Sequence, residues 1–152
     1  MKLLGPDKYI LAITDRQAQV RSSNGDPHFV APATKNKKPK LYVVSKEGQL
    51  LYIGVTSQSM SNRLRGGLTA KGEHGYHGYS WGREDHSIQL DIWYLIESAN
   101  PSLDAETIEA ETVFLYRMRS EQWPAAQTEI HFHPSEEEHR QCAQQILASL
   151  NK

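Results

Sequence analysis

The pattern of apolar and polar positions is clearest between residues 40 and 55. Two apolar segments, residues 41–44 and 50–55, are separated by the turn residues Lys46-Glu47-Gly48. Aromatic and β-branched residues favour strands, and a short turn with glycine between two such segments is typical of a hairpin. We therefore expect a β-hairpin that carries Tyr42 on its first strand and Tyr52 on its second.

The register of this hairpin decides on which face the tyrosines lie. A three-residue loop pairs Tyr42 with Tyr52 on one face, whereas a two-residue loop puts them on opposite faces, because strand residues alternate. The three-residue loop is favoured because it gathers one aliphatic face, and register follows the hydrophobic pattern. That face holds Leu41, Val43, Leu51, Ile53 and Val55, and the other holds Tyr42, Val44, Leu50, Tyr52 and Gly54.

Further along the chain the pattern predicts one strand and two helices. Residues 88–96 become continuously apolar, as in a buried central strand. Before this strand, a helix is expected to start near Ser57 or Ser59 and to end around Gly66-Gly67. After it, a helix capped by Ser102 or Asp104 is expected to run to about residue 120.

The chain is expected to close with an extended segment and a structural helix. Residues 128–133 are predicted to be extended, and Ser135 with Glu138 matches a capping box at the start of a helix. The buried side of that helix is expected to contain Cys142 or Ala143, Ile146, Leu147 and Leu150.

This order of elements predicts an α/β fold of the α+β kind, with a small, mostly antiparallel sheet of about three strands flanked by helices. The length of 152 residues fits one globular domain. Residues 1–38 are expected to form an N-terminal extension, in which residues 9–13 fit either a strand or a short helix. Residues 39–152 are expected to form the folded domain with its C-terminal helix.

The predicted helix before residue 120 carries an unusual carboxylate. Its apolar side is predicted to consist of Ile108, Phe114, Leu115 and Met118. At helical spacing Glu111 falls near the middle of that side, and Glu109 falls on the opposite, solvent side. An inward carboxylate is costly unless it is paired or binds a metal. Glu111 is therefore a candidate metal ligand, and an internal salt bridge is the alternative.

Charge is divided unevenly along the chain, although the net charge is only −1. Residues 1–83 contain 13 basic and 5 acidic residues, whereas residues 84–152 contain 4 basic and 13 acidic ones. The first part therefore suits a polyanion such as DNA, and the second does not. Two oppositely charged halves that simply pack together would give the same pattern.

The sequence also bears on location. We find no apolar segment near the 20 residues or so that a membrane helix needs, and no signal-peptide core at the N-terminus. The single cysteine, Cys142, excludes an internal disulfide and fits a reducing compartment. We therefore expect a cytoplasmic protein without a membrane partner.

Taken together, these residues resemble the GIY-YIG nuclease superfamily. Leu41-Tyr42 matches the second and third letters of the first motif, with Lys40 in place of its glycine, and Tyr52-Ile53-Gly54 matches the second motif. Arg63 follows Tyr52 by 11 residues, at the family's arginine position. Glu111 lies on a later helix, as the family's glutamate does. The resemblance covers about residues 40–128.

The resemblance implies metal-dependent hydrolysis of DNA phosphodiester bonds. Glu111 would hold one Mg²⁺ or Mn²⁺, and Arg63 would bind the phosphate. Tyr42 would orient or deprotonate the attacking water with support from Tyr52, and His77 would relay a proton. Further contacts to DNA are expected from Lys40, Arg65 and Gln127, the last in place of the family's asparagine.

Two alternatives stay open. One is a DNA-binding module on the same fold without catalytic activity. The other is a zinc protein that uses His131 and His133, which alternate on one strand, together with His139 on the last helix.

Overall fold

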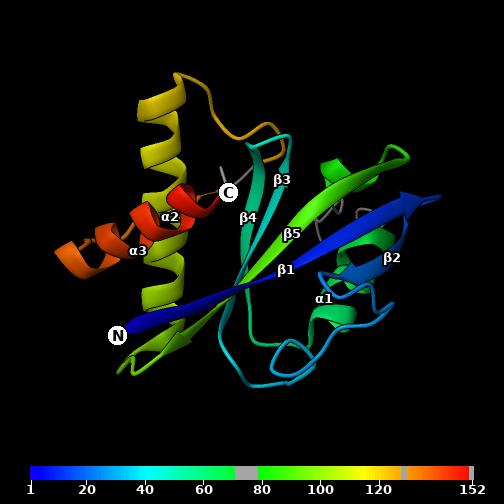
Figure 1. The fold of residues 1–152 in the computed structure, drawn as a ribbon. Coiled ribbons are helices and arrows are strands. Elements are labelled where there is room, and N and C mark those ends of the chain that lie inside the picture. Colours follow the sequence, from blue (N-terminus) through cyan, green and yellow to red (C-terminus); the bar gives the residue numbers. More distant parts are fainter. Residues whose placement is uncertain (71–78, 128–129, 151–152) are drawn as a thin grey trace.

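A five-stranded antiparallel sheet, packed with three α-helices, forms the centre of the computed structural model (Figure 1). The structure describes residues 1–70, 79–127 and 130–150. The strands are β1 (Lys2–Thr14), β2 (Gln17–Ser22), β3 (Lys40–Lys46), β4 (Gln49–Thr56) and β5 (His86–Ile96). The helices are α1 (Met60–Thr69), α2 (Pro101–Ser120) and α3 (Glu137–Ser149), with a 3₁₀ turn, η2, at Ser80–Gly82. The α+β class is thus confirmed.

The sheet has two more strands than expected, and both come from residues 1–38. Its order is β2-β1-β5-β3-β4, so β1 lies inside the sheet and pairs with β5 from Lys2 to Ile13. The segment around residues 9–13 is uniformly apolar, which hides the alternation of a strand. Tyr9, Leu11 and Ile13 are buried, whereas Ile10 remains 48% exposed on the other face. These residues are therefore part of the sheet and not a lead-in to it.

The β3–β4 hairpin forms as predicted, but with another register. Glu47 and Gly48 both have positive φ, as in a two-residue type I′ turn. Tyr42 pairs with Gly54 and Val44 with Tyr52, after which Leu51 is an extra residue in β4. The shorter turn alone would have put Tyr52 on the face opposite to Tyr42. The extra residue returns Tyr52 to the same face. The tyrosines therefore share one face, as predicted, while Leu50 and Leu51 exchange faces.

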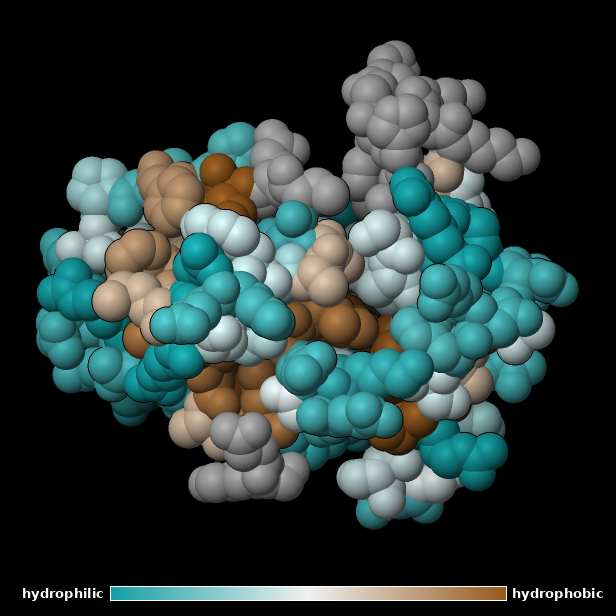
Figure 2. Space-filling model, turned by 90° about the horizontal axis from the view of Figure 1, so that it is seen from above, coloured by the Kyte–Doolittle hydropathy of each residue, from teal (hydrophilic) through white to brown (hydrophobic). Residues whose placement is uncertain are grey.

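The two faces of the sheet bury separate clusters. The tyrosine face packs with α1 and contains Tyr42, Val44 and Leu90, whereas the aliphatic face packs with α2 and α3 and contains Leu41, Val43 and Leu50. Figure 1 shows α2 and α3 together on one side of the sheet and α1 by β1 and β2. The view onto the end where α2 and the β3–β4 hairpin finish shows apolar surface divided by polar side chains (Figure 2).

The helix boundaries differ from expectation where tertiary packing decides them. α1 continues through Gly66-Gly67 to Thr69, because Gly67 lies against the ring of Tyr79, where a Cβ atom would be 2.0 Å from a ring carbon. α2 begins at Pro101 with Asn100 as its N-cap, one turn earlier than a cap at Asp104 would give. Proline suits this first position because its missing N–H needs no partner there.

α3 begins with a capping box made of Glu136 and His139, where the sequence suggested Ser135 and Glu138. The His139 ring accepts a hydrogen bond from the Glu136 amide through Nδ1, and its Nε2 lies 2.8 Å from Asp104 Oδ1 on α2. The predicted buried side of this helix is confirmed, with Cys142, Ala143, Ile146, Leu147 and Leu150 all in the core. Within the described residues, no helix is both long and apolar enough to cross a membrane.

We predict that the contact of Asp104 with α3 is lost in acid. Burial acts to raise the pKa of Asp104, but hydrogen bonds from Ser98 and His139 outweigh it and leave this pKa below its usual value. Such a carboxylate contributes stability above its unfolded pKa of about 4, which is lost as the pH falls through the lower folded pKa. Asp104→Asn should lower the free energy of unfolding at pH 6 by roughly 1 kcal/mol.

Urea unfolding measured at pH 6 and at the lowest pH that keeps the protein folded tests this prediction. The difference between wild type and Asp104→Asn should shrink in acid, and a constant difference would contradict the assignment. Asp26→Asn, in an exposed turn, is the control and should change stability little at either pH.

Candidate functional site

Three tyrosines from distant parts of the chain meet on one face of the sheet. Tyr42 and Tyr52 come from the hairpin, and Tyr79 precedes η2. The Tyr42 ring centroid lies 5.9 Å from that of Tyr52 and 6.3 Å from that of Tyr79, and Tyr52 and Tyr79 are 5.5 Å apart. Trp81 stacks on Tyr79 at 4.5 Å. The tyrosine cluster therefore consists of Tyr42, Tyr52, Tyr79 and Trp81.

The hydroxyls of this cluster form a chain of hydrogen bonds with one consistent direction. Tyr79 donates to the carbonyl of Arg63 at 3.4 Å, and a phenol has only one proton to donate. In the 2.9 Å bond between Tyr42 and Tyr79, Tyr42 must then be the donor. Tyr42 is in turn hydrogen-bonded to Tyr52, which is left to donate. The chain thus runs from Tyr52 through Tyr42 and Tyr79 to the backbone of α1.

Only one member of this chain is placed to meet a substrate. Tyr42 is fully buried and Tyr79 is 3% exposed, whereas Tyr52 is partly exposed. Burial and the neighbouring phenols raise the pKa of both Tyr42 and Tyr52, and Arg63 acts in the opposite direction on both. Tyr52 is therefore the tyrosine of this chain that solvent reaches, and Tyr42 is its buried hydrogen-bond partner.

Arg63 joins the cluster from α1. Its guanidinium carbon lies 5.1 Å from the centroid of the Tyr79 ring, within the range of a cation–π contact. The residue is half-buried and lowers the pKa of Tyr52 by its charge. Arg63 thus contacts Tyr79 directly, and its charge acts on both hairpin tyrosines.

Of the two glutamates on α2, Glu109 is the one whose charge acts on a tyrosine of the cluster. The charge of Glu109 raises the pKa of Tyr52, which requires the two groups to be near each other. Residues two apart on a helix point about 200° apart, so Glu111 faces elsewhere. Glu111 lies two turns after Asp104 and on the same side of α2. From that side Asp104 contacts α3. The assignment of a metal to Glu111 stays a prediction, and Glu109 is the carboxylate whose charge acts on Tyr52.

Lys40, expected to contact DNA, is instead fully buried. Its ammonium donates to the carbonyls of Lys35, Lys38 and Gln58 at 2.7–3.0 Å, which uses all three of its protons. Burial lowers the pKa of this lysine. Lys40 therefore fastens the loop before β3 to the start of α1, and its place in the first motif is structural.

Gln127 reaches the second motif through its side chain. Its amide accepts from the Ile53 N–H at 3.0 Å and donates to the Ile53 carbonyl at 3.1 Å, while the Ala126 amide donates to Leu51 O. The chain after α2 thus pairs with the outer edge of β4 beside Tyr52. Gln127 holds this strand in place, which differs from the substrate contact expected for it.

The other predicted residues lie apart from the cluster or outside the described residues. Arg65 is exposed and borders a pocket on the far side of α1 from Arg63. His77 falls in residues 71–78, outside the part of the chain that the structure describes. His133 pairs with Glu106 at 2.8 Å and His139 with Asp104. Among the described residues, no three His, Cys, Asp or Glu side chains converge as a zinc site would need.

Sequence reasoning assigned no catalytic place to Tyr79 and Trp81, and it placed Glu109 in solvent. Tyr79 and Trp81 belong to a segment rich in glycine and aromatic residues, and both are buried. The signal for Glu109 was its position four residues from Val113 on the buried side of α2. Comparison with models of known families, with characterised proteins and with solved structures finds no match to this chain.

We predict that Tyr79→Phe destabilises the protein by roughly 1–2 kcal/mol, because it leaves the buried Tyr42 hydroxyl without its acceptor. Urea unfolding measures this loss. Tyr116→Phe removes a phenol hydroxyl from the opposite cluster and should cost less than about 0.5 kcal/mol. Equal effects of the two substitutions would show that the hydroxyl chain does not stabilise the site.

We also predict that Lys40→Met lowers the free energy of unfolding by about 2 kcal/mol or more, since it strips buried carbonyls of their donor. Lys38→Met, at an exposed position, should change stability by less than about 0.5 kcal/mol. If Lys40→Met has wild-type stability but binds DNA more weakly, Lys40 contacts DNA and does not stabilise the fold.

Proposed function

We propose that this protein is a metal-dependent DNA endonuclease of the GIY-YIG type, and that Tyr52, Arg63 and Glu109 form its reactive centre. The observation that carries the proposal is the surroundings of Tyr52: its partly exposed ring packs against Tyr42 and Tyr79, Arg63 contacts the Tyr79 ring, and the charges of Arg63 and Glu109 both act on the Tyr52 phenol. These groups come from β4, α1 and α2, so the fold gathers them from three separate elements. Their types and order are those of the resemblance seen in the sequence, with Glu109 proposed in the place given there to Glu111.

The donor set at this centre suits Mg²⁺ or Mn²⁺. Mg²⁺ typically takes one or two protein carboxylates and completes its shell with water and substrate phosphate, so Glu109 alone is a sufficient protein ligand. Zinc usually needs three or four protein ligands, which the described residues do not bring together. When bound, the divalent ion would neutralise charge on the phosphate and stabilise the leaving oxygen.

The chain's own residues have separable tasks. Arg63 would bind the scissile phosphate through its planar set of donors and stabilise the charge that develops there. Tyr52 would hydrogen-bond the attacking water, oriented by its own bond to the buried Tyr42. Because the pKa of Tyr52 is raised, this phenol is protonated at neutral pH and needs a nearby cation before it can act as a base.

The approach of DNA is favoured from the side of α1. Lys35, Lys37 and Lys38 are exposed on the loop before β3, and the Lys37 amide donates to Ser57 O just ahead of α1. The same helix carries Arg63. This basic surface would contact phosphates on both sides of the cleavage point and give binding that weakens with salt.

A non-catalytic DNA-binding module remains the second candidate, because the buried hydroxyl chain would also stabilise a fold without activity. Such a module would bind DNA through the same basic surface. It would leave DNA intact with either Mg²⁺ or Mn²⁺.

We predict that Glu109→Gln lowers Mg²⁺-dependent nicking of supercoiled plasmid about 100-fold or more, as expected for a group that acts on the transition state. Glu111→Gln, the same change two residues away, should keep activity within about threefold. Arg63→Lys keeps the charge but not the planar donors and should also be impaired.

Circular dichroism and urea unfolding confirm that each variant is folded. Equal cleavage by Glu109→Gln and wild type would overturn the proposed centre, and loss with Glu111→Gln alone would return the metal to that residue. Binding of DNA by the wild type without cleavage in Mg²⁺ or Mn²⁺ would favour the binding module. Loss of activity only on zinc removal would favour the histidines.

A further inference from the structure

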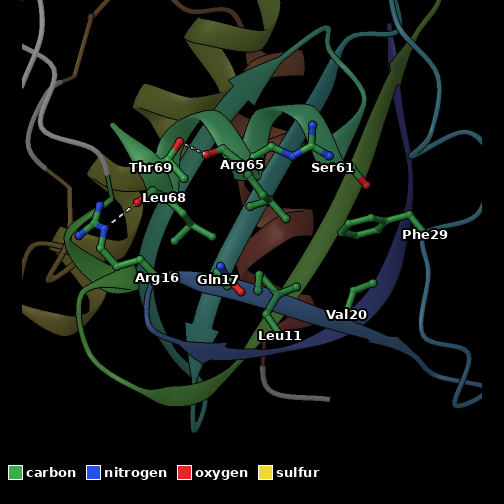
Figure 3. A pocket seen from close by; sticks show the side chains of 11 residues that line it. Leu11, Arg16, Gln17, Val20, Phe29, Ser61, Arg65, Leu68 and Thr69 are labelled. Carbon is green, nitrogen blue, oxygen red and sulfur yellow. Dashed lines mark hydrogen bonds between the residues drawn. The ribbon is translucent and has the colours of Figure 1, made fainter. Parts of the chain in front are cut away.

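A separate pocket of about 480 Å³ lies between α1 and the strands β1 and β2. Figure 3 shows the side chains that surround it, with α1 on one side, the strands on the other and Phe29 at one end. Its interior is apolar and aromatic, formed by Leu11, Val20, Phe29, Leu64 and Leu68. Binding pockets for small ligands usually enclose about 300–1,000 Å³, so one nucleotide fits this volume.

The rim of this pocket is polar and basic. Arg65 extends along α1 toward Ser61, and Gln17 approaches from β2 (Figure 3). Arg16 donates through Nε to the Leu68 carbonyl at 2.6 Å, while its Nη2 is buried with no hydrogen-bond partner among the described residues. Among the residues that the structure describes, none that lines the pocket is acidic. The rim therefore offers polar side chains and the positive charge of the exposed Arg65 to an anion.

The pocket and the proposed reactive centre share α1. Arg63 contacts the tyrosine cluster from one side of the helix, and Arg65 borders the pocket from the other. Two residues correspond to about 3 Å along a helix, and its side chains span about 10 Å across. A single DNA strand that crosses α1 would thus reach both arginines.

We propose that this pocket binds an unpaired nucleotide next to the cleaved bond, with its base in the apolar interior and its phosphate at Arg65. The identity of the ligand rests on the proposed nuclease function. Bases stack on aromatic side chains and arginine planes, and the amide and hydroxyls at the rim suit their polar edges. A paired base cannot enter, so the substrate would be a single strand, a flap or a junction with unpaired bases.

The test measures binding without cleavage, in EDTA, using a fluorescein-labelled thymidine oligonucleotide and a blunt duplex. Ala18→Phe places a ring in the pocket from β2. Gln19→Phe adds the same ring to the next residue, which points to the opposite face, and is its matched control. Arg65→Gln, at an exposed position, removes one charge, and Arg21→Gln on β2 is its control.

Ala18→Phe and Arg65→Gln should weaken binding of the single strand about fivefold or more, as expected when one base contact is lost. Binding of the blunt duplex should change less than about twofold, because other phosphate contacts dominate there. The control variants should bind both DNAs like the wild type. Wild-type affinity of both pocket variants for the single strand would overturn the inference.

NMR titration with free thymidine monophosphate separates a nucleotide from other anions. Amide shifts that are confined to α1, β1 and β2 support nucleotide binding in the pocket. If thymidine monophosphate causes no shifts and decanoate does, the pocket binds a fatty acid instead. Plasmid nicking is scored separately. Absence of nicking by the wild type in Mg²⁺ or Mn²⁺ overturns the nuclease proposal alone, whereas unchanged single-strand binding by the pocket variants overturns the pocket alone.

Discussion

The burial of the Tyr42 phenol is the constraint on which the site depends. Its hydroxyl has no access to water, so it needs partners within the protein, and Tyr52 and Tyr79 provide them. Two glycines make room for these rings. A Cβ atom at Gly54 would lie 2.5 Å from the Tyr42 side chain, and one at Gly67 would lie 2.0 Å from Tyr79. The hairpin motif and α1 are therefore packed against each other through the same three rings.

The hairpin, the helix with Arg63 and the central strand were all predictable, because each has a strong local pattern. The position of β1 was not, because its solvent-facing residues are apolar too, so that no alternation shows. The turn was misjudged for a related reason. The shorter loop shifts the residues of β4 to the opposite face, and the bulge at Leu51 shifts the residues from Tyr52 onward back again. The pattern of faces therefore does not reveal either change. Tyr42 and Tyr52 share a face in either case, which is why that conclusion held.

The choice between Glu109 and Glu111 could not be made from α2 by itself. The large apolar residues Phe114 and Met118 suggested the buried side, yet they are 46% and 64% exposed. The buried side instead consists largely of small residues such as Ala105 and Ala110, against which other elements pack closely. Knowing which side of a helix is covered requires knowing where its neighbours lie. That information resides in α3 and the sheet, far away in the sequence.

The buried ammonium of Lys40 does for the backbone around it what a small bound cation could do. Its ammonium collects three backbone carbonyls from two segments, as a small cation would, but it is covalently part of β3. The loop before β3 and the start of α1 are therefore held without any exchangeable ion. Chelators and salt act on this arrangement only weakly, since the charge is buried. When a chelating agent abolishes an activity of this protein, the cause can be sought at the proposed reactive centre, because the scaffold around Arg63 contains the ammonium of Lys40 as its own cation.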